Sequence, residues 1–246
     1  MDACLAGGVF TFEENFLPVI QNVYQNPELD GLCASFSAVT DGLEERIQRQ
    51  FGQGLDADLT LYLGLCHGAG WVVKLAGRDV VLLGIEKILE LNWQSREAMT
   101  GLVYHELGHV YHRRHGALDQ GAEDGPEGFV WQLFTEGVAM CFEQDLVGDS
   151  RWFHQDSSGW LAWCEAHFSE ILADFDGELP KMVLLYFAYR SAITTAGGMW
   201  AITLGPGLCA ACWSGFRSKR SSPFRRSVCA PCTGNLPDSM RGLEPY

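Results

Sequence analysis

The sequence lacks several features that mark common classes of protein. No run of apolar residues approaches the ~20 residues that a membrane-spanning helix needs. Positive charge is scarce, because 17 Lys and Arg stand against 31 Asp and Glu and the net charge is −14. This balance argues against nucleic acid or an anionic membrane as a partner. We therefore expect a chain of 246 residues to fold as a globular protein with a sizeable core.

Basic residues are also missing from the N-terminal part of the chain, where the first is Arg46. A secretory signal begins with a positively charged segment, so none is predicted. The cysteines number nine, which is odd and does not suit a framework of disulfides. Five of them lie among apolar residues, as reduced core cysteines do: Cys4, Cys33, Cys66, Cys141 and Cys164. The sequence predicts a cytoplasmic protein with free thiols.

The most informative segment is residues 105–109, His-Glu-Leu-Gly-His, which has the pattern His-Glu-x-x-His in a helical context. Histidines four residues apart lie on one face of a helix, so His105 and His109 can bind the same metal ion. Glu106 can then reach a water molecule at an open coordination position without being a ligand. Hydrolysis by zinc needs this combination of neutral nitrogen ligands, an open position and a carboxylate that accepts a proton. The alternative is a surface helix with two solvated histidines.

A zinc ion at this motif needs a third protein ligand. Glu136 is the one acidic residue at the centre of the apolar helical segment 133–142, where a carboxylate is costly to bury unless it binds a cation. Glu143 follows two turns later and is expected to be solvated. Glu136 is therefore the predicted third ligand, and an exposed helix position is the alternative.

His115 is a second candidate, because it completes the His-x3-His-x5-His spacing of the metzincin peptidases. That pattern requires a glycine where this chain has His112. We expect the helix to continue to Gly116 and to carry His115 away from the metal. Asp119 and Asp124, in the following glycine-rich loop, are weaker candidates.

Residues 105–109 followed by residues 135–139, Thr-Glu-Gly-Val-Ala, resemble the gluzincin group of zinc metallopeptidases, and bacterial zinc-dependent peptidases of that type in particular. In that group the third ligand is the Glu of a Glu-Gly-x-Ala-like segment on the next helix. The likeness is specific over residues 101–143 and looser over residues 57–200. It implies a zincin-like α+β fold, with a small sheet packed over the metal-binding helix, and a peptide or protein as substrate.

Periodicity predicts one domain over residues 1–204. It comprises N-terminal helices in 1–52, a small sheet in 57–84, and the metal-binding and C-terminal helices in 95–200. Helices are expected at 12–25, 29–51, 84–92, 96–115 and 127–147, and strands at 59–63, 71–75 and 80–83.

The turn at residues 76–79 predicts that the last two strands form a hairpin. In zincins an edge strand at this place pairs with extended substrate. An edge strand capped within the fold is the alternative.

Residues 182–190 form an apolar, helix-like segment that carries Tyr189 and Arg190. In related peptidases a tyrosine, histidine or arginine from a later helix often donates a hydrogen bond to the oxyanion. Tyr189 is therefore a candidate catalytic residue, and a core tyrosine is the alternative.

The composition changes after about residue 205. Residues 205–246 carry a net charge of +4, whereas residues 1–204 carry −18. A Cys-x2-Cys pair and a second Cys-x2-Cys pair have the spacing of a zinc ribbon, which makes a second, structural zinc an alternative: Cys209, Cys212, Cys229 and Cys232. No alternating apolar pattern supplies the strands of a ribbon. The composition favours a disordered or aberrant tail, including the product of a frameshift.

The sequence thus predicts an α+β peptidase with Zn²⁺ as cofactor, in which Glu106 is the general base. Two alternatives belong to other classes: a non-catalytic zinc-binding or regulatory protein on the same scaffold, and an interaction protein that acts through the C-terminal cysteines. Glu106 is present, as catalysis requires, and this favours the enzyme.

Overall fold

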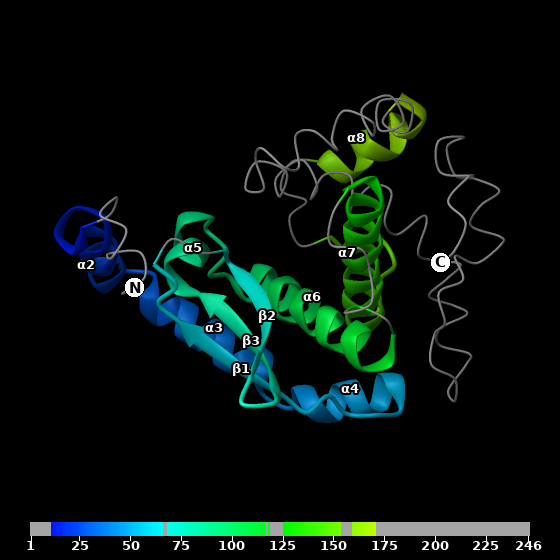
Figure 1. Cartoon of the computed structure of the whole chain (residues 1–246), viewed down its shortest axis with the longest axis horizontal. Coiled ribbons are helices and arrows are strands. Elements are labelled where there is room, and N and C mark those ends of the chain that lie inside the picture. Colours follow the sequence, from blue (N-terminus) through cyan, green and yellow to red (C-terminus); the bar gives the residue numbers. More distant parts are fainter. Residues whose placement is uncertain (1–10, 66–67, 117, 119–124, 154–158, 171–246) are drawn as a thin grey trace. The chain divides into compact units, whose positions relative to one another are not determined.

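The computed structural model describes residues 11–65, 68–116, 118, 125–153 and 159–170 (Figure 1). In these ranges the fold is α+β, as predicted, and a three-stranded sheet precedes the long helix α6 (Arg96–His115). The chain divides into two compact units whose border lies between Glu106 and Leu107, inside α6. The predicted domain limits at residues 204 and 205 lie outside the described residues. No helix in the described ranges is long and apolar enough to span a membrane.

The N-terminal segment begins with a π-helical turn, η1 (Phe12–Phe16), and continues as α2 (Leu17–Gln25). The single helix expected over residues 29–51 is in fact two, α3 (Leu29–Thr40) and α4 (Leu43–Phe51). Asp41 is extended, and Gly42 has a φ of 63°, a left-handed conformation that glycine adopts without steric cost. Helical periodicity continues across residues 41 and 42, so the sequence pattern does not reveal the break between the two helices.

Arg46 on α4 is partly exposed, and its side chain contacts α6. Its guanidinium donates to the hydroxyl of Tyr104 on α6 and lies 5.9 Å from the centroid of that ring. Tyr104 is only 1% exposed, so its hydroxyl needs a partner inside the protein. The pair therefore anchors α4 to α6.

The sheet consists of β1 (Ala57–Tyr62), β2 (Gly70–Leu75) and β3 (Arg78–Gly84), with β3 in the middle. β2 and β3 are antiparallel and form the predicted hairpin, in which Leu75 pairs with Arg78. The two residues between them both have positive φ, as in a type I′ turn. β1 pairs with β3 in parallel, which leaves β2 as an edge strand.

The two faces of this sheet differ. Val81 and Leu83 on β3 are fully buried, and they share their face with Gly70 of β2, which pairs with Leu83. The opposite face carries Trp71 and Leu75 of β2, which are 39% and 52% exposed. The face that carries Val81 and Leu83 packs into the core. The other face buries Val80 of β3 but leaves apolar side chains of the edge strand exposed.

The remaining helices are α5 (Ile85–Glu90), α7 (Gly125–Val147) and α8 (Trp160–Ala166). The bounds of α6 and α7 match the predicted helices closely. Every residue of α6 from Ala98 to His112 is buried except Thr100, His105 and His109, which are partly exposed. A helix enclosed in this way is core rather than surface.

The cysteines are only partly as predicted. Cys141 and Cys164 are free and buried, whereas Cys33 on α3 is free and exposed. Burial raises the pKa of Cys141 to about 12, with a smaller contribution from Asp145, so this thiol stays protonated. Cys4 and Cys66 lie outside the described residues.

Gly108 on α6 packs closely against the backbone of α7. A Cβ built at this position would lie 2.6 Å from the Cα of Ala139 on α7 and 2.9 Å from its carbonyl oxygen. Both are backbone atoms, so no side-chain rotation relieves the overlap. A residue larger than glycine would push α7 away from α6.

We expect Gly108→Ala to lower the free energy of unfolding by about 1–3 kcal/mol, because the added methyl group overpacks the helix contact. The matched control is Gly31→Ala on α3, where the nearest atom to an added Cβ is a flexible carboxylate oxygen at 3.8 Å. That change should raise stability by about 0.4–1 kcal/mol through the unfolded state. Thermal and urea unfolding measure both, and equal effects of the two substitutions would contradict the close contact.

Candidate metal centre

His105 and His109 occupy neighbouring turns of α6 and are two of the three partly exposed positions in its buried stretch. Spacing by four residues places them one above the other on one face. The helix is therefore closed along most of its surface and open where its two motif histidines lie. This is the arrangement that a ligand pair needs, because a metal ion must enter from outside the core.

Glu136 on α7 completes a group of three. One ligand atom from each of His105, His109 and Glu136 lies within 4.8 Å of the others, and all three side chains are partly exposed. The Nε2 atom of His109 is 3.7 Å from Oε2 of Glu136. Because Glu136 lies one turn before Ala139, the contact between Gly108 and Ala139 brings this carboxylate beside His109.

The donor set suits a divalent transition metal. Zinc binds His nitrogen and carboxylate oxygen at about 2.0–2.2 Å, so adjacent ligand atoms of a tetrahedral site are about 3.4 Å apart. The separation of 3.7 Å between His109 and Glu136 is close to that value. Two imidazoles and one carboxylate also leave a fourth position for water or substrate, as in catalytic rather than structural zinc sites.

Glu106 is 7% exposed and lies between the two histidines in sequence. It is not a member of the group of three that could hold a metal. A carboxylate that is buried beside a metal site, but is not a ligand, can accept and return protons.

His115 is not part of the group, and α6 runs through His112 to His115 without a break. The ring of His115 packs instead against Tyr111, at 4.6 Å between centroids. The metzincin pattern is therefore not realised in the described residues. Asp119 and Asp124 lie outside them.

His112 is a buried aromatic residue of the core, only 2% exposed. Its ring lies 5.5 Å from Phe134 and 6.0 Å from Trp131, both on α7. Burial lowers the pKa of His112 to about 3, and repulsion from His109 adds to the shift. The side chain is therefore neutral at ordinary pH.

Glu143 departs from the prediction, since it is fully buried rather than solvated. One of its carboxylate oxygens accepts a hydrogen bond from the indole N–H of Trp152. Helical spacing in the apolar segment predicts a surface position for Glu143, because local pattern carries no information about a partner later in the chain. The hydrogen bond from Trp152, nine residues later in the chain, offsets part of the free-energy cost of burying this carboxylate.

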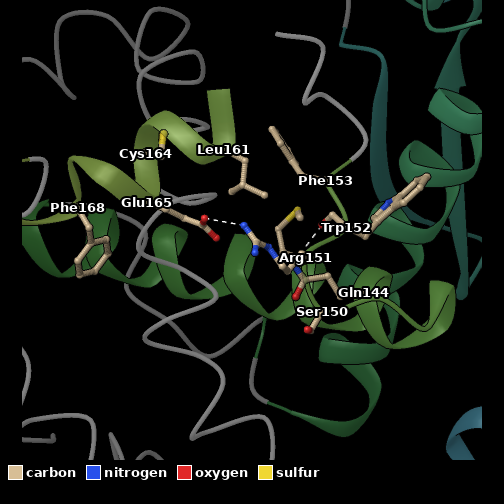
Figure 2. A pocket seen from close by; sticks show the side chains of 10 residues that line it. Gln144, Ser150, Arg151, Trp152, Phe153, Leu161, Cys164, Glu165 and Phe168 are labelled. Atoms are coloured by element: carbon tan, nitrogen blue, oxygen red, sulfur yellow. Dashed lines mark hydrogen bonds and ion pairs between the residues drawn. The ribbon is translucent and has the colours of Figure 1, made fainter. Parts of the chain in front are cut away.

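A pocket lies beside α8, at the C-terminal end of α7 (Figure 2). Met140 and Cys164 line it from buried positions, and Trp152 forms part of its wall. Arg151 and Glu165 form an ion pair of 2.7 Å at the pocket, and both are more than half exposed. None of the three candidate metal ligands lines this pocket.

Two site features carried no sequence signal strong enough to predict. Gly70 lies against Glu106, and Gly108 lies against Ala139. Isolated glycines of this kind mark a close approach of backbone, but the sequence does not say which segment approaches. Tyr189, Cys209, Cys212, Cys229 and Cys232 lie outside the described residues.

Zinc titration of two variants distinguishes the candidate third ligands. Glu136→Ala removes one of three ligands, and we expect zinc affinity to fall by far more than the ~10–100-fold typical of residues outside the ligand set. His115→Ala should leave zinc affinity near that of the unchanged protein, because His115 is not in the group. The reverse ranking would mean that the ligand set is wrong.

The burial of His112 has a consequence for acid stability. Its pKa is about 3 in the folded state against 6.5 unfolded, so the unfolded chain binds the extra proton. This residue therefore costs nothing above pH 6.5, and stability falls by ~1.4 kcal/mol per pH unit as the pH drops from 6.5 toward 3. We expect His112→Leu to unfold at a lower pH than the unchanged protein, as followed by circular dichroism. Identical acid midpoints would contradict a buried, neutral His112.

Comparison with known proteins adds no assignment. No family model, no curated protein and no solved structure matches the chain. The metal centre therefore stands on its own geometry: a group of two histidines and a glutamate that could hold a metal ion.

Proposed function

We propose that the protein is a zinc-dependent peptidase of the gluzincin type. The observation that carries the proposal is the convergence of His105, His109 and Glu136, whose ligand atoms lie within 4.8 Å of one another. The buried Glu106 follows His105 directly in the chain. The three would hold Zn²⁺, which supplies a Lewis acid that polarises the scissile carbonyl and lowers the pKa of a bound water. The same ligand types in the same order along the chain characterise the gluzincins that the sequence resembles.

Glu106 is the proposed general base. It accepts a proton from the attacking water and later delivers this proton to the amine that leaves. Its near-complete burial favours the role, because a carboxylate shielded from solvent interacts more strongly with the charges that develop beside it. The proposed substrate is a peptide or protein in extended form.

The edge strand β2 supports a peptide substrate. Among the strands of the described residues it pairs with β3 on one side only, so its outer edge could pair with an extended chain. Its first residue, Gly70, packs against Glu106. A peptide added along β2 would therefore run past the proposed base. Main-chain pairing of this kind selects for extended conformation more than for sequence.

A non-catalytic zinc-binding protein on the same scaffold would need the three ligands but not Glu106. Glu106 is present at the position where the catalytic mechanism requires a carboxylate, and this favours the enzyme. The proposed cytoplasmic location and the absence of nucleic-acid and membrane partners rest on composition alone.

Substitution of Glu106 by Gln tests the proposed chemistry. The change keeps size and hydrogen bonding but removes the base, so zinc content should stay near that of the unchanged protein while turnover falls by at least ~100-fold. The measurements are metal analysis of purified protein and the release of new amino groups from a casein digest. Glu97→Gln, at an exposed position in the first turn of the same helix, is the matched control and should keep full turnover. Hydrolysis that persists unchanged in Glu106→Gln would rule out this mechanism.

A further inference from the structure

Gly70 and Glu106 pack directly on each other. A Cβ built on Gly70 would lie 2.5 Å from Oε1 of Glu106 and 2.8 Å from both Cδ and Cγ of the same side chain. These separations are about 1 Å below ordinary van der Waals contact. The outer part of the Glu106 side chain, from Cγ to the carboxylate, therefore rests on the α-carbon of Gly70, and any side chain at position 70 would occupy the same space.

Strand β2 cannot move away from Glu106 to accommodate a side chain at position 70. Gly70 pairs with Leu83 on the central strand β3, and Leu83 is fully buried. The N–H of Gly84 donates to the carbonyl of Ala69 at 2.9 Å, and a Cβ on Gly84 would lie 2.6 Å from the carbonyl oxygen of Gly68. Residues 68–70 are thus held against the end of β3 by backbone contacts on more than one side.

Glu106 would have to give way instead, and its surroundings limit where it can go. The side chain is 7% exposed, and its helix neighbours Val103 and Leu107 are 0% and 2% exposed. A buried side chain in a close-packed environment moves only by displacing others. The contact with Gly70 therefore fixes one side of the space that the carboxylate occupies.

We propose that Gly70 is a positioning residue for Glu106: by lacking a side chain, it holds the carboxylate at the place where it acts. The inference rests on the proposed function, in which Glu106 is the base. The edge strand that would pair with a peptide begins at this glycine, so one contact sets the distance between the bound peptide backbone and the base. A methyl group at position 70 would displace the carboxylate by about 1 Å, a shift that can lower turnover by up to ~100-fold.

The test is a double-substitution cycle with Gly70→Ala, Glu106→Ala and the pair, each in the full chain. Glu106→Ala removes all three contacting atoms, so the methyl group then has space. We expect Gly70→Ala alone to lower the melting temperature by about 5 °C and to cost little or nothing in the Glu106→Ala background. Equal shifts in the two backgrounds would overturn the inference. This part of the test needs no activity, so it stands even if the proposed function fails.

The second measurement separates positioning from mere stability. Zinc content and casein-digest turnover are measured well below the melting temperature of each variant. Gly70→Ala should keep its zinc and lose about 10- to 100-fold in turnover. Gly68→Ala is the matched control in the same segment, because its added Cβ would meet only the carbonyl oxygen of Gly70, at an ordinary 3.6 Å. Turnover of Gly70→Ala that equals that of Gly68→Ala would overturn the positioning role, whereas absence of turnover in the unchanged protein would overturn the proposed function alone.

Discussion

The approach of α7 to α6 at Gly108 is the constraint on which the candidate metal centre depends. Gly108 lies between the two motif histidines, and only a hydrogen atom separates its α-carbon from the backbone of Ala139. At this distance a carboxylate one turn before Ala139 comes within 3.7 Å of His109. With bulkier residues in the contact, the helices would stand farther apart and the third ligand would not reach. The geometry of the ligands is therefore decided by a residue that is not a ligand.

The burial of α6 explains why its few polar residues differ so much in environment. His112, Glu106, His105 and His109 lie within eight residues, yet the first two are buried and the motif histidines are partly open. Burial holds His112 neutral, so it packs among aromatic rings as an uncharged residue. The same enclosure surrounds Glu106 with apolar neighbours, where fixed charges interact more strongly than they do in water. One helix thus supplies both core residues and two candidate metal ligands, because adjacent positions face different surroundings.

Much of the fold and of the candidate metal site could be predicted from the sequence, and the features that could not be predicted share a cause. The two long helices, the hairpin and the choice of Glu136 over His115 follow from local patterns: periodicity, turn residues and the missing glycine at His112. The break at Gly42, the contact of Arg46 with Tyr104 and the buried Glu143 each depend on a partner distant along the chain or on a single backbone angle. The parallel pairing of β1 with β3 is likewise a long-range choice. Local propensity carries no information about such partners, so these features emerge only in three dimensions.

The mixed sheet also constrains the order in which this region can assemble. β2 and β3 are joined by two residues and need only a local turn, a step that takes microseconds in isolated hairpins. β1 must instead wait for β3, because its parallel partner follows an intervening strand and the loop between them has to close first. We therefore expect the hairpin to form first and β1 to add to it afterwards. β3 is the middle strand of the sheet and has a neighbour on each side. We expect its amide hydrogens to be the last in the sheet to exchange with solvent.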